Sequence, residues 1–189
     1  MNHHIATGLV FYQDHYHEPN FLGNCHFEIK RPADCSITQL HHFYMLLRKG
    51  NKVSPVDLPL KIFSAAFLAF CYNGKRLVGI SAIKRPNLAY LEDVHQKAGI
   101  ANGIHQPFLE IGYSFTRESV RRKGISSTLK RMLLKKISDH QGILFSTTAT
   151  PSSQRFLMGN GFRPKGNPYQ GKFDNNIIYF ERSGHIMTY

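Results

Sequence analysis

The chain has 189 residues, 42% of them hydrophobic, and its 24 Lys and Arg against 12 Asp and Glu give a formal net charge of +12. This length fits one domain, and the apolar fraction is high enough for a packed core and excludes an intrinsically disordered chain. Apolar runs such as Ala65–Tyr72 fall far short of the roughly 18–20 residues that a membrane-spanning helix needs, so no membrane partner is expected.

The start of the chain and its cysteines indicate a reducing compartment. Residues 1–19 lack the basic start and continuous apolar stretch of a signal peptide. The three cysteines, Cys25, Cys35 and Cys71, are odd in number and are expected to be free thiols. We therefore expect a cytoplasmic protein with one domain over residues 1–189, in which 1–25 is an N-terminal extension without an assigned role.

The first half of the chain alternates between strand and helix signals. The predicted elements in this half are a strand over His26–Lys30, helices over Ile37–Arg48 and Pro55–Phe63, and strands over Ala66–Tyr72 and Arg76–Ile83. Asp34 or Ser36 could cap the first helix, and Gly50-Asn51 ends it. The dipeptide Asn73-Gly74 predicts a hairpin between the two later strands. Phe63 is assigned to the core together with the aromatic residues of the first of these strands.

In the second half, a long connection over Lys84–Gln106 is expected to hold a short helix around Tyr90–Lys97 or a substrate-facing lid. The predicted elements that follow are strands over Pro107–Thr116, Gly142–Thr147 and Asn175–Glu181, and helices over Arg122–Asp139 and Ser152–Met158. The longer helix has an apolar face, and its basic residues, Lys130 among them, are placed mostly on the others. Mixed strands and helices around a hairpin predict the α+β class, with a mixed, largely antiparallel central sheet flanked by helices.

The segment Leu109–Leu129 passes from a strand through a basic turn and one glycine into an amphipathic helix. A helix N-terminus exposes unpaired backbone N–H groups and the positive end of the helix dipole, and a glycine lets an anion approach the main chain. Arg121, Arg122 and Lys123 add positive charge, and Ser126 and Ser127 add hydroxyl donors. The pattern favours a phosphate site, although an ordinary strand–turn–helix with a solvated basic turn has the same outline.

Two motifs resemble the GNAT superfamily of acetyl-CoA-dependent N-acetyltransferases. Arg121-Arg122-Lys123-Gly124-Ile125-Ser126 is similar to that family's pyrophosphate motif, Arg/Gln-x-x-Gly-x-Gly/Ala, with Ser126 in the place of the final small residue. The short helix that ends at Gly161-Phe162 is similar to the family's later motif. The resemblance extends from about His26 to Glu181 and implies a GNAT-like acyltransferase fold.

The resemblance also implies a substrate and a site. Acetyl-CoA would be the acyl donor, and a primary amine would attack it directly in a ternary complex. The strand over Glu110–Phe115 would pair with the pantetheine arm and splay from its neighbour to form the slot for the thioester. The cofactor-binding residues would be Phe115, Thr116, Arg121, Arg122, Lys123, Gly124, Ile125, Ser126 and Ser127.

The catalytic residues follow less directly. Glu110 lies on the strand that would line the slot and is the candidate base, the alternative being a carboxylate at a strand edge facing solvent. Leu157 stands where the family often has the Tyr that protonates the departing thiolate, which leaves activity open. Tyr113 is a candidate replacement acid, and Tyr169 and Tyr179 are weaker candidates. Alternatively, the thiolate can leave unassisted, because the thiol pKa is near 8.5.

Other classes of function remain open. The net charge also suits a basic nucleic-acid-binding protein, or an acyltransferase whose acceptor amine is carried on nucleic acid, such as a charged tRNA. The histidines and cysteines near the N-terminus fit no zinc spacing, so no metal site is expected. The sequence leaves open both a homodimer and the identity of the acceptor.

Overall fold

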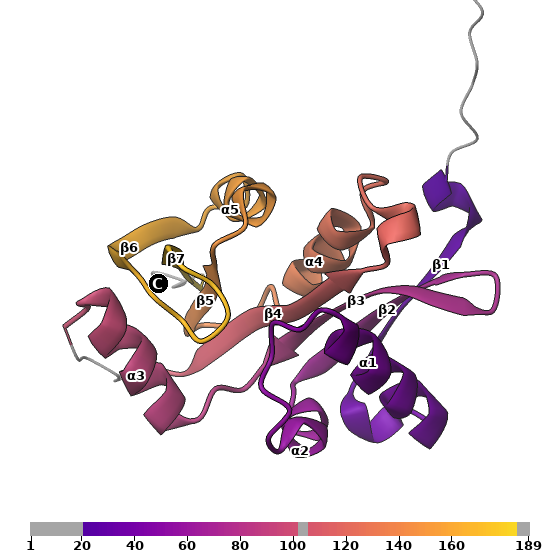
Figure 1. Ribbon diagram of the computed structural model, residues 1–189, viewed down its shortest axis with the longest axis horizontal. Helices are drawn as coiled ribbons and strands as arrows, with labels where there is room; N and C mark the ends of the chain where they lie inside the picture. Colours follow the sequence, from indigo (N-terminus) through magenta and orange to yellow (C-terminus); the bar gives the residue numbers. More distant parts are fainter. Residues whose placement is uncertain (1–20, 102–105, 185–189) are drawn as a thin grey trace, which may run out of the picture.

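The computed structural model describes residues 21–101 and 106–184, which form a seven-stranded sheet with helices on both faces (Figure 1). The strand order is β1-β2-β3-β4-β5-β7-β6, and all neighbours run antiparallel except β4 and β5, which run parallel. The strands are β1 (Cys25–Lys30), β2 (Phe67–Asn73), β3 (Arg76–Lys84), β4 (Phe108–Thr116), β5 (Ile143–Thr148), β6 (Arg163–Tyr169) and β7 (Ile177–Ser183). The helices are α1 (Ile37–Lys49), α2 (Leu58–Phe63), α3 (Leu88–Ala98), α4 (Ile125–Lys136) and α5 (Pro151–Met158). The predicted α+β class with a mixed, largely antiparallel sheet is confirmed.

The core is divided by the sheet into layers. On one face α4 and α5 pack against the central strands, with Leu129, Leu133 and Leu157 buried there. On the other face α1 and α2 bury Phe43 and Leu58 against β2 and β3 (Figure 1). Helix α3 covers the end of the sheet formed by β5, β6 and β7. None of the helices in 21–101 and 106–184 is long and apolar enough to cross a membrane.

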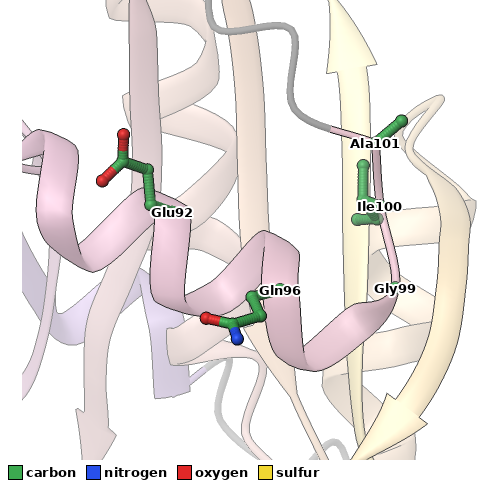
Figure 2. Close-up of a pocket in the computed structure, with 5 residues that line it drawn as sticks. All are labelled: Glu92, Gln96, Gly99, Ile100 and Ala101. Carbon is green, nitrogen blue, oxygen red and sulfur yellow. The ribbon is translucent and has the colours of Figure 1, made fainter.

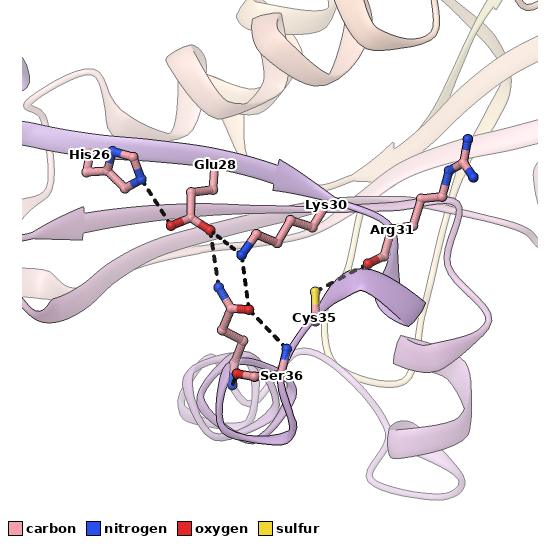
Figure 3. Close-up of polar contacts among 7 residues, drawn as sticks. His26, Glu28, Lys30, Arg31, Cys35 and Ser36 are labelled. Atoms are coloured by element: carbon pink, nitrogen blue, oxygen red, sulfur yellow. Dashed lines mark hydrogen bonds and ion pairs between the residues drawn. The ribbon is translucent and has the colours of Figure 1, made fainter.

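A polar network ties the start of α1 to the edge strand β1 (Figure 3). Glu28 on β1 contacts His26 and Lys30, each at 3.0 Å, and accepts a hydrogen bond from the Gln39 amide at 3.1 Å. Gln39 also completes a capping box with Ser36, the helix N-cap. Of the two predicted caps, Ser36 is therefore the one used, and the network fixes where α1 begins against the sheet.

A glycine on β3 lets α4 lie close to the sheet. A Cβ atom added at Gly79 would come within 2.4 Å of the Ile125 side chain, the first residue of α4, so no larger residue fits without movement. This close approach places the N-terminus of α4 beside the end of β4, where the candidate phosphate site was predicted.

Most predicted elements are confirmed with shifted ends. The hairpin loop is Gly74-Lys75, because Asn73 and Arg76 are paired. Helix α2 begins at Leu58 rather than Pro55, since Asp57 before it has a left-handed backbone. The strand β6 follows directly after Phe162, and its two prolines and one glycine conceal the usual strand pattern.

Two core assignments were wrong. Phe63 was placed in the core, but it is 59% exposed at the end of the short helix α2. Lys130 was placed on an outer face of its helix, but it is only 7% exposed because α5 covers that side of α4. The cysteines Cys25, Cys35 and Cys71 are free thiols, as predicted.

Candidate active site

The central feature of the site is an opening between β4 and β5. The two parallel strands pair from Phe108 with Ile143 as far as Glu110 with Phe145, although both strands continue beyond that point. At the start of the opening the Ser146 hydroxyl donates a hydrogen bond to the carbonyl of Ile111 at 2.9 Å. Backbone groups of β4 after Ile111 that face β5 are therefore left for another partner, such as an extended ligand.

An irregularity in β4 accompanies the opening. Tyr113 has φ of 50°, which is unusual for a bulky side chain in a strand, and the pairing of β3 with β4 shifts register between Ile80 and Ala82. A bulge of this kind bends a strand and redirects its backbone groups. The irregularity lies next to the point where the pairing of β4 with β5 ends.

Glu110, the predicted base, lies at the closed end of the opening and is only 4% exposed. One carboxylate oxygen contacts the ammonium of Lys84, its cross-strand partner on β3. The other accepts a hydrogen bond from the Tyr90 hydroxyl of α3 at 3.3 Å. The alternative of a solvent-facing strand-edge carboxylate is thus wrong, and Glu110 is a buried carboxylate held by two donors.

The tyrosines around Glu110 are kept protonated. Burial, and then the negative charge of Glu110, raise the pKa of Tyr90 well above its ordinary value. Burial raises the pKa of Tyr169 to about 12, and the Glu110 charge adds to the rise. The pKa of Tyr113 is also raised, first by burial and then by Glu110. All three hydroxyls are therefore neutral at physiological pH. They can donate hydrogen bonds and carry no negative charge.

At the other end of β4, the turn into α4 has the geometry of an anion cradle. Arg122 and Gly124 have φ of 63° and 81°, and Gly124 is the N-cap residue of α4. The first turn of α4 contains no acidic residue, and Gly124 offers no capping side chain, so the leading N–H groups and the helix dipole are uncompensated. Alternating left-handed residues of this kind point successive amides into one concavity.

The basic side chains of the turn are partly engaged with the protein. Arg121 donates to the carbonyl of Thr116 at 3.3 Å, lies 3.2 Å from Glu118 and stacks over the ring of Phe115 at 5.9 Å. The hydroxyl of Thr116 is buried and finds no hydrogen-bond partner among the described residues. The predicted residues from Phe115 to Ser127 thus gather around the end of β4 and the start of α4.

Between α4 and α5 lies a buried amine that the sequence reasoning missed. The Lys130 ammonium donates to the hydroxyl of Ser153 at 3.2 Å and lies 5.2 Å from the centroid of the Phe156 ring. Burial lowers the pKa of Lys130 to about 8. Leu157 is buried in the apolar layer beside α4, whereas Tyr113 packs with the layer of α1 and α2. Leu157 and Tyr113 thus lie in layers on opposite faces of the sheet.

The structure also brings Lys84, Tyr90 and Tyr169 to the site, and of these the sequence had singled out only Tyr169, as a further candidate acid. Lys84 and Glu110 are neighbours only because their strands pair in one register. Tyr90 reaches Glu110 from α3 and Tyr169 approaches from β6. For Tyr90, the one available signal was the long connection that contains it, which was expected to hold a short helix or a substrate-facing lid.

A surface hollow lies at the end of α3. It is lined by Glu92, Gln96, Gly99, Ile100 and Ala101 (Figure 2). None of the predicted site residues lines it. The described residues hold no cluster of three or more His, Cys, Asp or Glu side chains suited to a metal ion.

Comparison with solved structures identifies proteins that have a similar fold. No family model and no curated protein matches the sequence. Among solved structures, FeeM, an N-acyl amino acid synthase from uncultured soil microbes, has a TM-score of 0.66 at 14% identity, over 84% of this chain and 90% of that one. Escherichia coli ElaA has a TM-score of 0.64 at 16% identity, over 84% and 99%. Salmonella typhimurium yncA, solved with its cofactor acetyl-CoA, has a TM-score of 0.56 at 8% identity, over 88% and 97%.

These likenesses, with the sheet order and the strand opening, define the class of structure. The chain has the mixed α+β fold of the GNAT acyltransferases. At such low identities the likeness concerns the fold, and the chemistry has to be argued from the residues of this chain.

Proposed function

We propose that this protein is an N-acetyltransferase that moves an acetyl group from acetyl-CoA to a primary amine, by direct attack within a ternary complex. One observation supports the proposal above the others. The strand β4 has an uncapped helix N-terminus at one end and a buried carboxylate at the other, with an unpaired strand edge between them.

The uncapped end of α4 supports binding of the CoA pyrophosphate. Amides of residues 125–127 would donate to phosphate oxygens, and the basic turn Arg121–Lys123 would add positive potential. The unpaired edge of β4 would donate and accept hydrogen bonds with the amides of the pantetheine arm. Together these contacts would direct the thioester toward the closed end of the opening.

The closed end supports the chemistry. An amine that is protonated in water has to lose a proton before it can attack a carbonyl carbon. Glu110 is the general base that takes this proton at the closed end of the opening. A backbone N–H near the bend of β4 would stabilise the oxyanion that forms on the carbonyl. The amine nitrogen then bonds to the acetyl carbon as the carbon–sulfur bond breaks.

The proposal is tested by the release of CoA thiol. The full chain is incubated with acetyl-CoA and a panel of amines that contains amino acids, polyamines, lysine peptides and aminoacyl-tRNA, and free thiol is measured. Thiol release that depends on both substrates supports the proposal. Salt-sensitive RNA or DNA binding without thiol release from any amine would favour the nucleic-acid-binding alternative instead.

A further inference from the structure

Lys84 places a primary ammonium inside the candidate active site. Its side chain, the last of β3, is 17% exposed and contacts the Glu110 carboxylate, whose own side chain is 5% exposed. The Lys84 nitrogen lies 5.0 Å from the centroid of the Tyr90 ring and 4.8 Å from that of Tyr113. A carboxylate and two aromatic faces thus surround one ammonium group, and we name these three residues with Lys84 the amine cage.

Glycine at position 112 keeps space for the amine cage. A Cβ atom added at Gly112 would lie 3.0 Å from the Lys84 Cδ and 3.3 Å from a carboxylate oxygen of Glu110. Both contacts are tighter than ordinary van der Waals packing, so a larger residue would push the lysine or the carboxylate aside. The pairing of Lys84 with Glu110 therefore depends on the local build of β4 as well as on charge.

The amine cage has the groups that an acceptor amine needs. Aromatic faces attract an ammonium through their quadrupoles, and the carboxylate can take its proton. Glu110 is also the last residue of β4 that pairs with β5, so the cage adjoins the opening proposed for the thioester. On this view the Lys84 nitrogen occupies the position of the acceptor nitrogen.

We propose that Lys84 is itself acetylated by this protein. This inference rests on the proposed function, because it takes acetyl-CoA as the donor and Glu110 as the base. Glu110 removes a proton from the Lys84 ammonium, and the neutral nitrogen attacks the thioester carbonyl. The nitrogen–carbon bond forms, the carbon–sulfur bond breaks, and CoA leaves. Of the two protons that the nitrogen loses, one ends on the CoA sulfur and the other passes through Glu110 to solvent.

Acetylation would change the site. An acetylated Lys84 carries no charge and cannot pair with Glu110, so the carboxylate would be released for an external amine. The protein would then exist in an unmodified form, with Lys84 in the acceptor position, and an acetylated form with that carboxylate available.

Other lysines provide internal controls. Lys165 also pairs with a carboxylate, that of Glu181 at 2.8 Å, but its side chain is 50% exposed and lies on β6. Lys130 is buried, but its partner is the Ser153 hydroxyl, which is a far weaker base than a carboxylate. If burial alone or ion pairing alone caused acetylation, one of these two lysines would react as Lys84 does.

The test follows acetylation of the purified full chain by intact mass and by peptide mass spectrometry. With acetyl-CoA, we expect one acetyl group on Lys84 to appear first, at a rate that does not depend on protein concentration. Lys84→Arg should lose this modification, Lys165→Arg should keep it, and Glu110→Gln should slow it about a hundredfold or more, as loss of a general base does. Circular dichroism of each variant shows that it is folded.

Two outcomes would overturn the inference in different ways. If the protein acetylates an added amine while Lys84 stays unmodified, or reacts no faster than exposed lysines such as Lys165, self-acetylation is wrong and the proposed function stands. If calorimetry shows no binding of acetyl-CoA, both are wrong.

Discussion

At the scale of single residues, Glu110 is central to the proposed chemistry. A carboxylate that is 4% exposed would be costly to bury alone, and here Lys84 and Tyr90 compensate it. In a merely structural role, this pair would stabilise the junction of β3 and β4. In a catalytic role, an incoming amine would replace or displace Lys84 at the carboxylate.

We predict that Glu110→Gln lowers turnover by about a hundredfold or more, the usual contribution of a general base, and leaves acetyl-CoA affinity nearly unchanged. The amide keeps the shape of the side chain but cannot take the proton. Steady-state rates and calorimetry measure the two quantities separately. Glu28→Gln removes another ion-paired carboxylate, at the far edge of the sheet, and should leave turnover intact. Unchanged turnover in Glu110→Gln would make this residue structural.

Tyr113 is expected to matter little as an acid. Its pKa is raised by burial and by Glu110, which makes it a weaker proton donor, and it lies on the opposite side of the sheet from Leu157. We predict that Tyr113→Phe keeps most of the activity, because the thiolate leaves unassisted. A loss of about 10²–10⁴-fold with folding and acetyl-CoA affinity preserved would show that Tyr113 is the acid after all.

At the scale of elements, α4 shows what sequence periodicity could predict and what it could not. Its apolar spacing predicted the helix and most of its buried face, but the predicted start was Arg122, whereas α4 begins at Ile125 after the N-cap Gly124. The spacing could not reveal that α5 covers a second side of α4, which is why Lys130 was assigned to solvent. Likewise the pattern predicted β3 and β4 as strands, but only their register brings Lys84 to Glu110.

The burial of Lys130 makes stability depend on pH. Its pKa is near 8 in the folded protein, against an ordinary value of 10.5, so below about pH 8 both states are protonated and the folded state bears the full penalty of a buried charge. Between about pH 8 and 10.5 the unfolded chain binds the extra proton, and stability rises with pH.

We therefore predict that Lys130→Met is more stable than the natural chain by roughly 3 kcal/mol near pH 7, and that this difference shrinks as the pH approaches about 10. Urea unfolding at both pH values measures the difference. The exposed neighbour Lys135→Met should show almost no such change. A difference between Lys130→Met and the natural chain that is independent of pH would mean that folding does not shift the pKa of Lys130.

At the scale of the whole molecule, the proposed function assigns different tasks to the two ends of β4. The two motifs quoted from the sequence were enough to predict the class of fold and the anion cradle, because both are local in the chain. The amine cage could not be predicted in the same way, since its members come from β3, α3 and β4 and meet only through the sheet.

The most direct test of the account is calorimetric titration of the purified chain with acetyl-CoA. We predict binding with a Kd below about 1 mM, the range usual for enzyme substrates, and at least about tenfold weaker binding by Gly124→Val. Valine at φ of 81° would distort the turn before α4, whose amides are proposed to bind the pyrophosphate. Gly74→Val is the matched control, because it introduces the same side chain at positive φ in the β2–β3 hairpin, where a Cβ meets nothing within 4 Å, and it should bind as the natural chain does. No binding by the natural chain at millimolar acetyl-CoA, or equal binding by Gly124→Val, would contradict the account.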